Sequence, residues 1–173
     1  SAGDNFGSSV SEAGAVNNDG FDDVIVGARY DANNSSARVF SGANGAILYT
    51  FNGDDSADAT GDRFGWSVSD AGDVNNDGFD DVIVGASFDD NNGFQSGSAR
   101  VFSGANGAIL YTFNGNSAED NFGASVSAAG DVNNDGFDDL IVGAQYDNTS
   151  NGYWSGSARV FSGANGAILY TFN

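Results

Sequence analysis

The chain contains no cysteine, histidine, methionine, lysine or proline among its 173 residues. Without cysteine there is neither a disulfide nor a thiol nucleophile, and without histidine the commonest general base of enzymes is missing. The lack of lysine excludes Schiff-base catalysis, and the lack of cysteine, histidine and methionine excludes the softer ligands of transition metals. These absences predict that the protein is not an enzyme.

Long apolar runs and positive charges are also scarce. No stretch of 18 apolar residues exists, so we expect neither insertion into a membrane nor a signal peptide. The chain carries 24 Asp and Glu against five Arg, and its formal net charge is −19. Nucleic acid and anionic membrane surfaces repel so acidic a chain, so neither is an expected partner. The carboxylates reflect solubility, a salty habitat or the binding of divalent cations, and their recurrence at fixed offsets favours cation binding.

The chain is rich in glycine, with 26 residues, and in internal repeats. A Phe-Gly pair opens each of three copies at Phe6, Phe64 and Phe122, which are 58 residues apart. The sequence SARVFSGANGAILYTFN ends each copy without a change. We therefore expect a single array with no separate domains. The three predicted repeat units are residues 1–52, 53–114 and 115–173.

Each copy has the pattern of four short strands. In the second copy the expected strands are residues 65–69, 81–86, 99–103 and 108–113, and an Asn-Gly turn joins the last two. No segment has the spacing of an amphipathic helix. The predicted fold class is all-β, with three four-stranded antiparallel blades of a β-propeller. A stacked β-solenoid is the alternative, although its coils are usually much shorter than this repeat.

A nine-residue loop between the first and second expected strands carries oxygen ligands at fixed spacing. In the second copy it reads DVNNDGFDD over residues 73–81. Side chains at loop positions 1, 3, 5 and 9, with the backbone carbonyl of position 7, offer the oxygen donors that calcium prefers, and Gly78 permits the sharp turn. An EF-hand or a dockerin-type loop needs an acidic residue near position 12 and a helix after the loop. Here position 12 is a valine within an expected strand, which excludes both loop types. The other alternative is that these residues only form turns.

The loops predict two strong calcium sites and one weak or empty site. The ligands expected in the second copy are Asp73, Asn75, Asp77, Phe79 (carbonyl) and Asp81. Those expected in the third copy are Asp131, Asn133, Asp135, Phe137 (carbonyl) and Asp139. The first copy has Ala15 at position 1, and its remaining donors are Asn17, Asp19, Phe21 (carbonyl) and Asp23.

The Phe64-Gly65 pair, the loop of residues 73–81 and the following Ile83-Val84-Gly85-Ala86 together resemble the FG-GAP repeat. That repeat builds the β-propeller of integrin α-subunits and of many bacterial surface proteins. The proline that ends the family's Gly-Ala-Pro signature is absent from all three copies. The resemblance implies an innermost Phe-Gly strand, metal loops on one face, and a secreted or cell-surface protein with a role in adhesion.

The loops between the second and third strands are the most variable parts. Those of the second and third copies contain Phe94, Tyr153 and Trp154. Such rings either stack on a sugar or anchor a protein ligand, or they simply pack on the neighbouring blade. They are the candidate ligand-binding residues.

The leading hypothesis for function is a calcium-binding propeller module for structural or adhesive protein interaction outside the cell. A carbohydrate-binding propeller lectin is one alternative, and a truncated or amplified array without a ligand of its own is another. A hydrolase using Asp80 and Asp81 as paired carboxylates is disfavoured, because adjacent strand residues point to opposite sides.

Three blades leave two apolar faces bare, whereas integrin propellers have seven blades. Residues 1–5 (SAGDN) match the connector of residues 117–121 (SAEDN). The expected partner is therefore a second copy, and two chains joined head to tail would close a six-bladed ring. The rivals are an open wedge that aggregates and a nine-bladed trimer.

Overall fold

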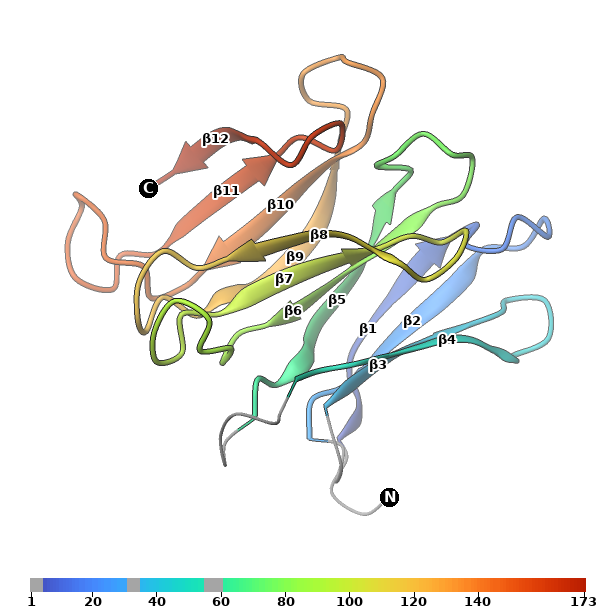
Figure 1. Ribbon diagram of the computed structural model, residues 1–173, viewed down its shortest axis with the longest axis horizontal. Helices are drawn as coiled ribbons and strands as arrows, with labels where there is room; N and C mark the ends of the chain where they lie inside the picture. The colour runs from blue at the N-terminus through green and yellow to red at the C-terminus, as the bar shows by residue number, and fades with distance from the viewer. Residues whose placement is uncertain (1–4, 31–34, 55–60) are drawn as a thin grey trace.

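The computed structural model describes residues 5–30, 35–54 and 61–173. Within these ranges the chain forms twelve strands in three four-stranded antiparallel sheets (Figure 1). The all-β prediction of four-stranded blades is confirmed. The described ranges contain no helix that is long and apolar enough to cross a membrane.

The three sheets have the same strand order, in which each strand pairs with the next along the chain. We call them blade 1, blade 2 and blade 3. Blade 1 contains β1 (Phe6–Gly14), β2 (Asp23–Ala28), β3 (Ser36–Phe40) and β4 (Ile47–Asn52). Blade 2 contains β5 (Phe64–Gly72), β6 (Asp81–Ala86), β7 (Ser98–Phe102) and β8 (Ile109–Asn114). Blade 3 contains β9 (Phe122–Gly130), β10 (Asp139–Ala144), β11 (Ser157–Phe161) and β12 (Ile168–Phe172).

Burial along the strands follows from their position in the sheet. Every residue of β6 is buried, as expected for an apolar strand with a neighbour on each side and a blade against each face. In the outer strand β8 only Phe113 is buried, because β8 lies at the edge of its sheet. In β5 the register with β6 shifts between Phe64 and Ser67, where Gly65 adopts a φ of 83°. Glycine permits this bulge without steric cost.

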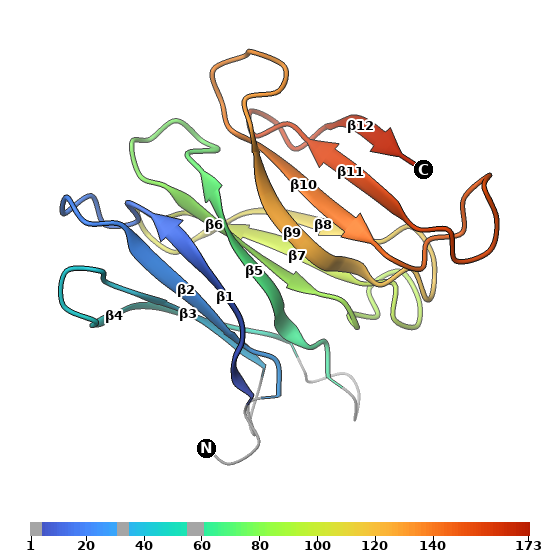
Figure 2. The same ribbon diagram turned by 180° about the vertical axis from the view of Figure 1, so that it is seen from behind.

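The apolar cores lie between the blades. The first strands β1, β5 and β9 are neighbours, and the sheets fan out from them (Figure 2). One core joins blade 1 to blade 2, and the other joins blade 2 to blade 3. The ring of Phe51 stacks on that of Phe102 with centroids 4.1 Å apart, and Phe113 stacks on Phe161 at the same distance. The two junctions are therefore built in the same way.

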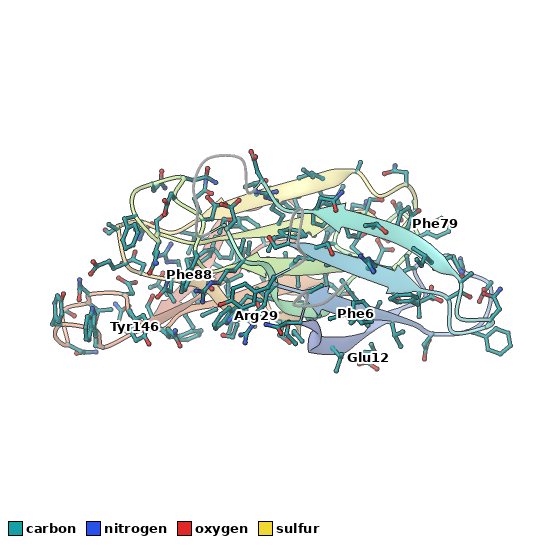
Figure 3. All side chains as sticks on the ribbon, turned by 90° about the horizontal axis from the view of Figure 1, so that it is seen from below. Phe6, Glu12, Arg29, Phe79, Phe88 and Tyr146 are labelled. Atoms are coloured by element: carbon teal, nitrogen blue, oxygen red, sulfur yellow. The ribbon has the colours of Figure 1, made fainter. Side chains whose placement is uncertain are left out.

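The loops sort onto two sides of the molecule. The β1–β2, β5–β6 and β9–β10 loops, which carry the predicted calcium ligands, leave the sheets on one side (Figures 1 and 2). The β6–β7 and β10–β11 loops, which carry the candidate ligand-binding aromatics, leave on the other. Phe79 of the first group and Tyr146 of the second lie at opposite ends of the molecule in Figure 3.

Candidate metal-binding loops

The β5–β6 loop, residues 73–81, is closed by its own side chains. The carboxylate of Asp73 accepts the N–H groups of Asp77 at 3.0 Å and of Gly78 at 2.8 Å. The N–H of Asp77 also donates to Asn75 Oδ1 at 3.0 Å, and the N–H of Phe79 donates to Asp77 Oδ1 at 3.0 Å. The side chains at loop positions 1, 3 and 5 are thus drawn toward one another around a single tight turn.

The β9–β10 loop, residues 131–139, repeats this arrangement. Asp131 accepts the N–H groups of Asp135 and Gly136, each at 2.9 Å. Asn133 Oδ1 accepts the same Asp135 N–H at 2.9 Å, and Asp135 Oδ1 accepts the N–H of Phe137 at 3.1 Å. Two separate stretches of sequence therefore converge on one loop conformation.

The aspartate at loop position 9 anchors each loop to the body of its blade. The side chain of Asp81 is fully buried, and it accepts the N–H groups of Val74 and Gly104, each at 3.0 Å. Asp139 is equally buried and accepts those of Val132 at 2.9 Å and Gly163 at 3.0 Å. In blades 2 and 3 one carboxylate thus joins the candidate metal-binding loop to the turn between the third and fourth strands.

The electrostatics of the second loop suit a cation. Burial raises the pKa of Asp81 to about 7, the N–H groups of Gly104 and Val74 oppose the shift, and the carboxylates of Asp77 and Asp73 add to it. A buried carboxylate beside two others is unfavourable as an anion, and a bound divalent cation reverses that penalty.

The donor set matches calcium better than other metals. In the described part of the chain, no three acidic side chains form a ready metal cage by themselves. The loop instead offers a mixed set of three carboxylates, one amide oxygen and one backbone carbonyl, all of them hard oxygen donors. Calcium accepts such mixed oxygen sets with flexible geometry. The residues present therefore fit the ion that the spacing predicted, and binding itself stays a prediction.

The profile of the FG-GAP repeat matches residues 64–102 and 122–161, which lie in blades 2 and 3 and include both complete loops. This chain carries FG-GAP repeats.

Relatives of these FG-GAP repeats include integrin alpha subunits. Human integrin alpha-11 is 32% identical over 80% of this chain. Integrin alpha-4 of Xenopus laevis is 30% identical over 80%, and integrin alpha-PS5 of Drosophila melanogaster is 33% identical over 82%. The chain spans only 12%, 14% and 15% of the length of these three relatives.

One solved structure with a likeness to this chain is that of quinohemoprotein alcohol dehydrogenase from Comamonas testosteroni. It aligns over 87% of this chain and 27% of that chain, with a TM-score of 0.48 and 14% sequence identity. At this degree of likeness the alignment bears on neither the chemistry nor the ligands of the FG-GAP repeats.

The corresponding loop of blade 1, residues 15–23, lies outside the matched repeats and differs from the other two loops at its first position. Ala15 has no carboxylate to accept the N–H groups that Asp73 and Asp131 accept in their loops. The rest of the pattern persists, since Asn17 Oδ1 accepts the N–H of Asp19 at 3.0 Å and Asp19 Oδ1 accepts that of Phe21 at 3.1 Å. The fully buried Asp23 accepts the N–H of Gly42 at 3.0 Å. The first loop thus keeps these hydrogen bonds but lacks one of the carboxylates that could bind a metal ion.

Sequence reasoning missed the role of the aspartate at loop position 8. Asp80 Oδ2 accepts the N–H of Ala15 in blade 1 at 2.6 Å, and Asp138 Oδ2 accepts the N–H of Asp73 in blade 2 at 3.1 Å. Each bond links the loop of one blade to the loop of the blade before it. The signal was present, because Asp recurs at this position in all three copies, but its partner lies in another copy. Asp80 and Asp81 also face different partners, unlike a catalytic pair.

The candidate ligand-binding aromatics are only partly brought together. The rings of Tyr153 and Trp154 stack with centroids 4.9 Å apart, and Trp154 also lies 5.7 Å from Tyr146. Trp154 borders a cavity of about 320 Å³ between blades 2 and 3. The residues that line it are Gln95, Glu119, Asn121, Tyr146 and Trp154. Phe94 is 56% exposed and is not among them.

Arginine and aromatic residues fill the corresponding place between blades 1 and 2. The Arg29 guanidinium lies 4.4 Å from the centroid of the Trp66 ring, and that of Arg63 lies 3.5 Å from the Phe88 ring. Arg29 and Phe88 lie on the same side of the molecule (Figure 3). Cation–π contacts of this kind hold the guanidinium groups against the rings. Arg63 and Phe88 thus stand at the positions that Asn121 and Tyr146 occupy beside the cavity at the next junction.

Proposed function

We propose that this chain is a calcium-binding β-propeller module that supports structural or adhesive protein interaction outside the cell, and that it is not an enzyme. The observation that carries the proposal is the pair of closed loops, 73–81 and 131–139. In each, two carboxylates and one amide lie around a single tight turn, and a buried carboxylate stands at position 9. The similarity to integrin alpha subunits supports the extracellular setting. The calcium levels found there would fill sites of even modest affinity.

In this proposal calcium supplies charge neutralisation rather than chemistry. The side chains of Asp73, Asn75, Asp77 and Asp81, with the carbonyl of Phe79, would hold the ion in the second loop. The matching residues from Asp131 to Asp139 would hold it in the third. An ion that binds only the folded loop stabilises the folded state by mass action. The loops would thereby fix the ends of the first two strands of each blade.

We expect isothermal titration with calcium to give two strong sites per chain and a weak or absent third. The reason is the missing carboxylate at Ala15. The substitution Ala15→Asp restores the donor set of the other loops and should raise the number of strong sites to three. As a control, Asn44→Asp adds the same charge in an exposed turn, where its side-chain oxygen accepts the N–H of Ala46. It should leave the stoichiometry unchanged. Three equal sites in the unaltered chain would contradict the prediction.

A second candidate function, carbohydrate binding, is favoured by the cavity beside Trp154. Its volume of about 320 Å³ lies within the range of small-molecule sites, and it combines aromatic rings with amide and carboxyl groups. Four of its five lining residues, all except Tyr146, have a φ between 49° and 67°. Asn5 and Arg63, the equivalents of Asn121, have φ values of 50° and 54°, so at that position the conformation belongs to the repeat and not to the cavity.

If the cavity binds a sugar, a glycan array should show a signal that Trp154→Ala abolishes by removing the stacking ring. Phe94→Ala is the matched control, because both side chains are 56% exposed and only Trp154 borders the cavity. The signal should persist with EDTA as long as the blades stay folded, since the cavity lies on the side opposite the metal loops. An array without any signal would favour a repeat array that has no glycan ligand.

A further inference from the structure

The chain makes one kind of blade junction twice. We call the surface that a blade presents to the next blade its forward face, and the surface that it presents to the preceding blade its backward face. The forward face of blade 1 is Ala13, Val16, Ile25, Ala37, Val39 and Phe51, and the same residue types form that of blade 2. The backward face of blade 2 is Phe64, Val68, Val82, Val84, Ala86 and Phe102. Blade 3 repeats it with one change, Leu140 in place of Val82.

The forward face of blade 3 is open although its residues are the same. Val132 is 42% exposed, whereas its equivalents Val16 and Val74 are 1% and 0% exposed. Phe172 is 54% exposed, whereas its equivalents Phe51 and Phe113 are 7% and 8% exposed. Side chains that are core elsewhere in the chain therefore face outward here.

The backward face of blade 1 is open in the same way. Phe6 is 51% exposed against 0% for Phe64, and Val10 is 67% exposed against 6% for Val68. Val24, 45% exposed, corresponds to the buried Val82. An uncovered apolar surface of this kind is rare on a soluble monomer and marks an interaction site.

The two open faces also carry the two partners of a hydrogen bond that forms at each internal junction. At both internal junctions a tyrosine hydroxyl donates to a glycine carbonyl, from Tyr49 to Gly104 at 2.8 Å and from Tyr111 to Gly163 at 2.6 Å. The third tyrosine, Tyr170, lies on the forward face of blade 3. The third glycine, Gly42, is exposed on blade 1, whereas Gly104 and Gly163 are buried.

The open faces also carry both partners of the contact between a glycine at the end of one blade's first strand and the position-8 aspartate of the next blade. Gly14 and Gly72 lie so close to Asp80 and Asp138 of the next blade that neither has room for a Cβ. Gly130 in blade 3 has no atom within 4 Å of its Cβ position. Asp22, the equivalent of Asp80, is exposed on blade 1. The space beside Gly130 thus fits the carboxylate that blade 1 presents.

We propose that the forward face of blade 3 binds the backward face of blade 1 of a second copy of this chain. The contact reproduces the two internal junctions, with Phe172 beside Phe40, Tyr170 bonded to Gly42, and Asp22 bonded to the N–H of Asp131. A second copy of the chain is the partner that these faces fit, because every residue named on the two open faces is of the same type as its equivalent in the buried junctions. The contact is heterologous, so two copies make it twice and close a ring of six blades, within the four to eight that propellers typically have.

The proposal is tested first by the mass of the chain in solution. Light scattering at micromolar concentration should give twice the chain mass of 17.6 kDa. Val10→Asp and Phe172→Asp each place a charge in one half of the junction and should each give a folded monomer, because both side chains are already exposed in the single chain. The control is Ile168→Asp on the same strand as Phe172. Ile168 is 55% exposed, and its equivalent Ile109 is 57% exposed despite neighbours on both sides, so this variant should remain a dimer.

Mixing the two monomeric variants distinguishes this contact from a symmetric one. Val10→Asp keeps an intact blade 3 face, and Phe172→Asp keeps an intact blade 1 face. The mixture should therefore form a heterodimer through one junction, whereas neither variant pairs with itself. A monomeric unaltered chain, or dimers in which Val10→Asp and Phe172→Asp change nothing, would overturn the proposal. A trimer of nine blades would overturn the six-bladed ring.

Discussion

Replacing Asp81 by alanine is expected to lower the free energy of unfolding of the calcium-free chain by about 2–4 kcal/mol. The carboxylate accepts the N–H groups of Val74 and Gly104 in a fully buried position, and each donor left without an acceptor costs about 1–3 kcal/mol. The loss of a buried charge, whose pKa is already raised by burial, offsets part of this cost. The measurement is urea denaturation with EDTA.

The matched variant is Asp77→Ala, which removes a carboxylate from the same loop at an exposed position. Its bonds to Phe79 and Asn75 lie at the surface, where water replaces them. With EDTA it should lose less than about 1 kcal/mol, in keeping with most surface substitutions. With calcium the unaltered chain should gain stability and both variants should gain less, because each lacks one ligand of the second loop. Equal losses for Asp81→Ala and Asp77→Ala with EDTA would contradict the anchoring role of Asp81.

Much of the fold is readable from a single repeat. The second strand was predicted at residues 81–86 and is observed at Asp81–Ala86, because an unbroken apolar run of that length suits a central strand. The first strand was predicted at 65–69 but extends over Phe64–Gly72. Bulges interrupt this strand, and its small and polar residues lack the alternation of apolar and polar residues that marks a strand with one solvent-exposed face.

The shape of the loops at residues 73–81 and 131–139 is readable from the sequence for a different reason. Their donors lie within nine residues, so their spacing alone brings them together, and the bonds of Asp73 and Asn75 to the N–H of Asp77 follow from the turn. The fully buried position of Asp81 was not readable, because it depends on Gly104 in the turn between β7 and β8.

Contacts between blades are not readable from the sequence, because each one joins two copies of the repeat. The bond from Ala15 to Asp80 spans 65 residues, and no spacing within a repeat reveals it. The cavity beside Trp154 has the same origin, since Gln95 comes from blade 2 and Trp154 from blade 3. Repeat arrays are stabilised largely by such neighbour contacts. The features that a single repeat does not predict are therefore the contacts at the junctions between blades.

Gly85 offers a direct test of how tightly two blades are packed. A Cβ on Gly85 of β6 would collide with the carbonyl oxygen of Gly123 on β9, which is backbone and has little freedom to move. Gly85→Ala should therefore force blades 2 and 3 apart and cost about 3 kcal/mol or more, at or above the usual range for overpacking. Urea denaturation of the Phe172→Asp chain, with and without Gly85→Ala, measures this cost free of any contribution from a second copy.

Gly143 is the equivalent position in blade 3. A substitution there tests the contact with a second copy separately from the stability of the single chain. A Cβ there would collide only with Ser125 Oγ, the movable end of a side chain in the same blade. In the Phe172→Asp background we therefore expect Gly143→Ala to change the free energy of unfolding by less than about 1 kcal/mol. In the unaltered chain it should give a monomer, because the proposed junction would bring Gly7 of a second copy against it as Gly123 lies against Gly85. Equal costs for Gly85→Ala and Gly143→Ala in the Phe172→Asp background would mean that the close approach of the blades is not what makes Gly85 necessary.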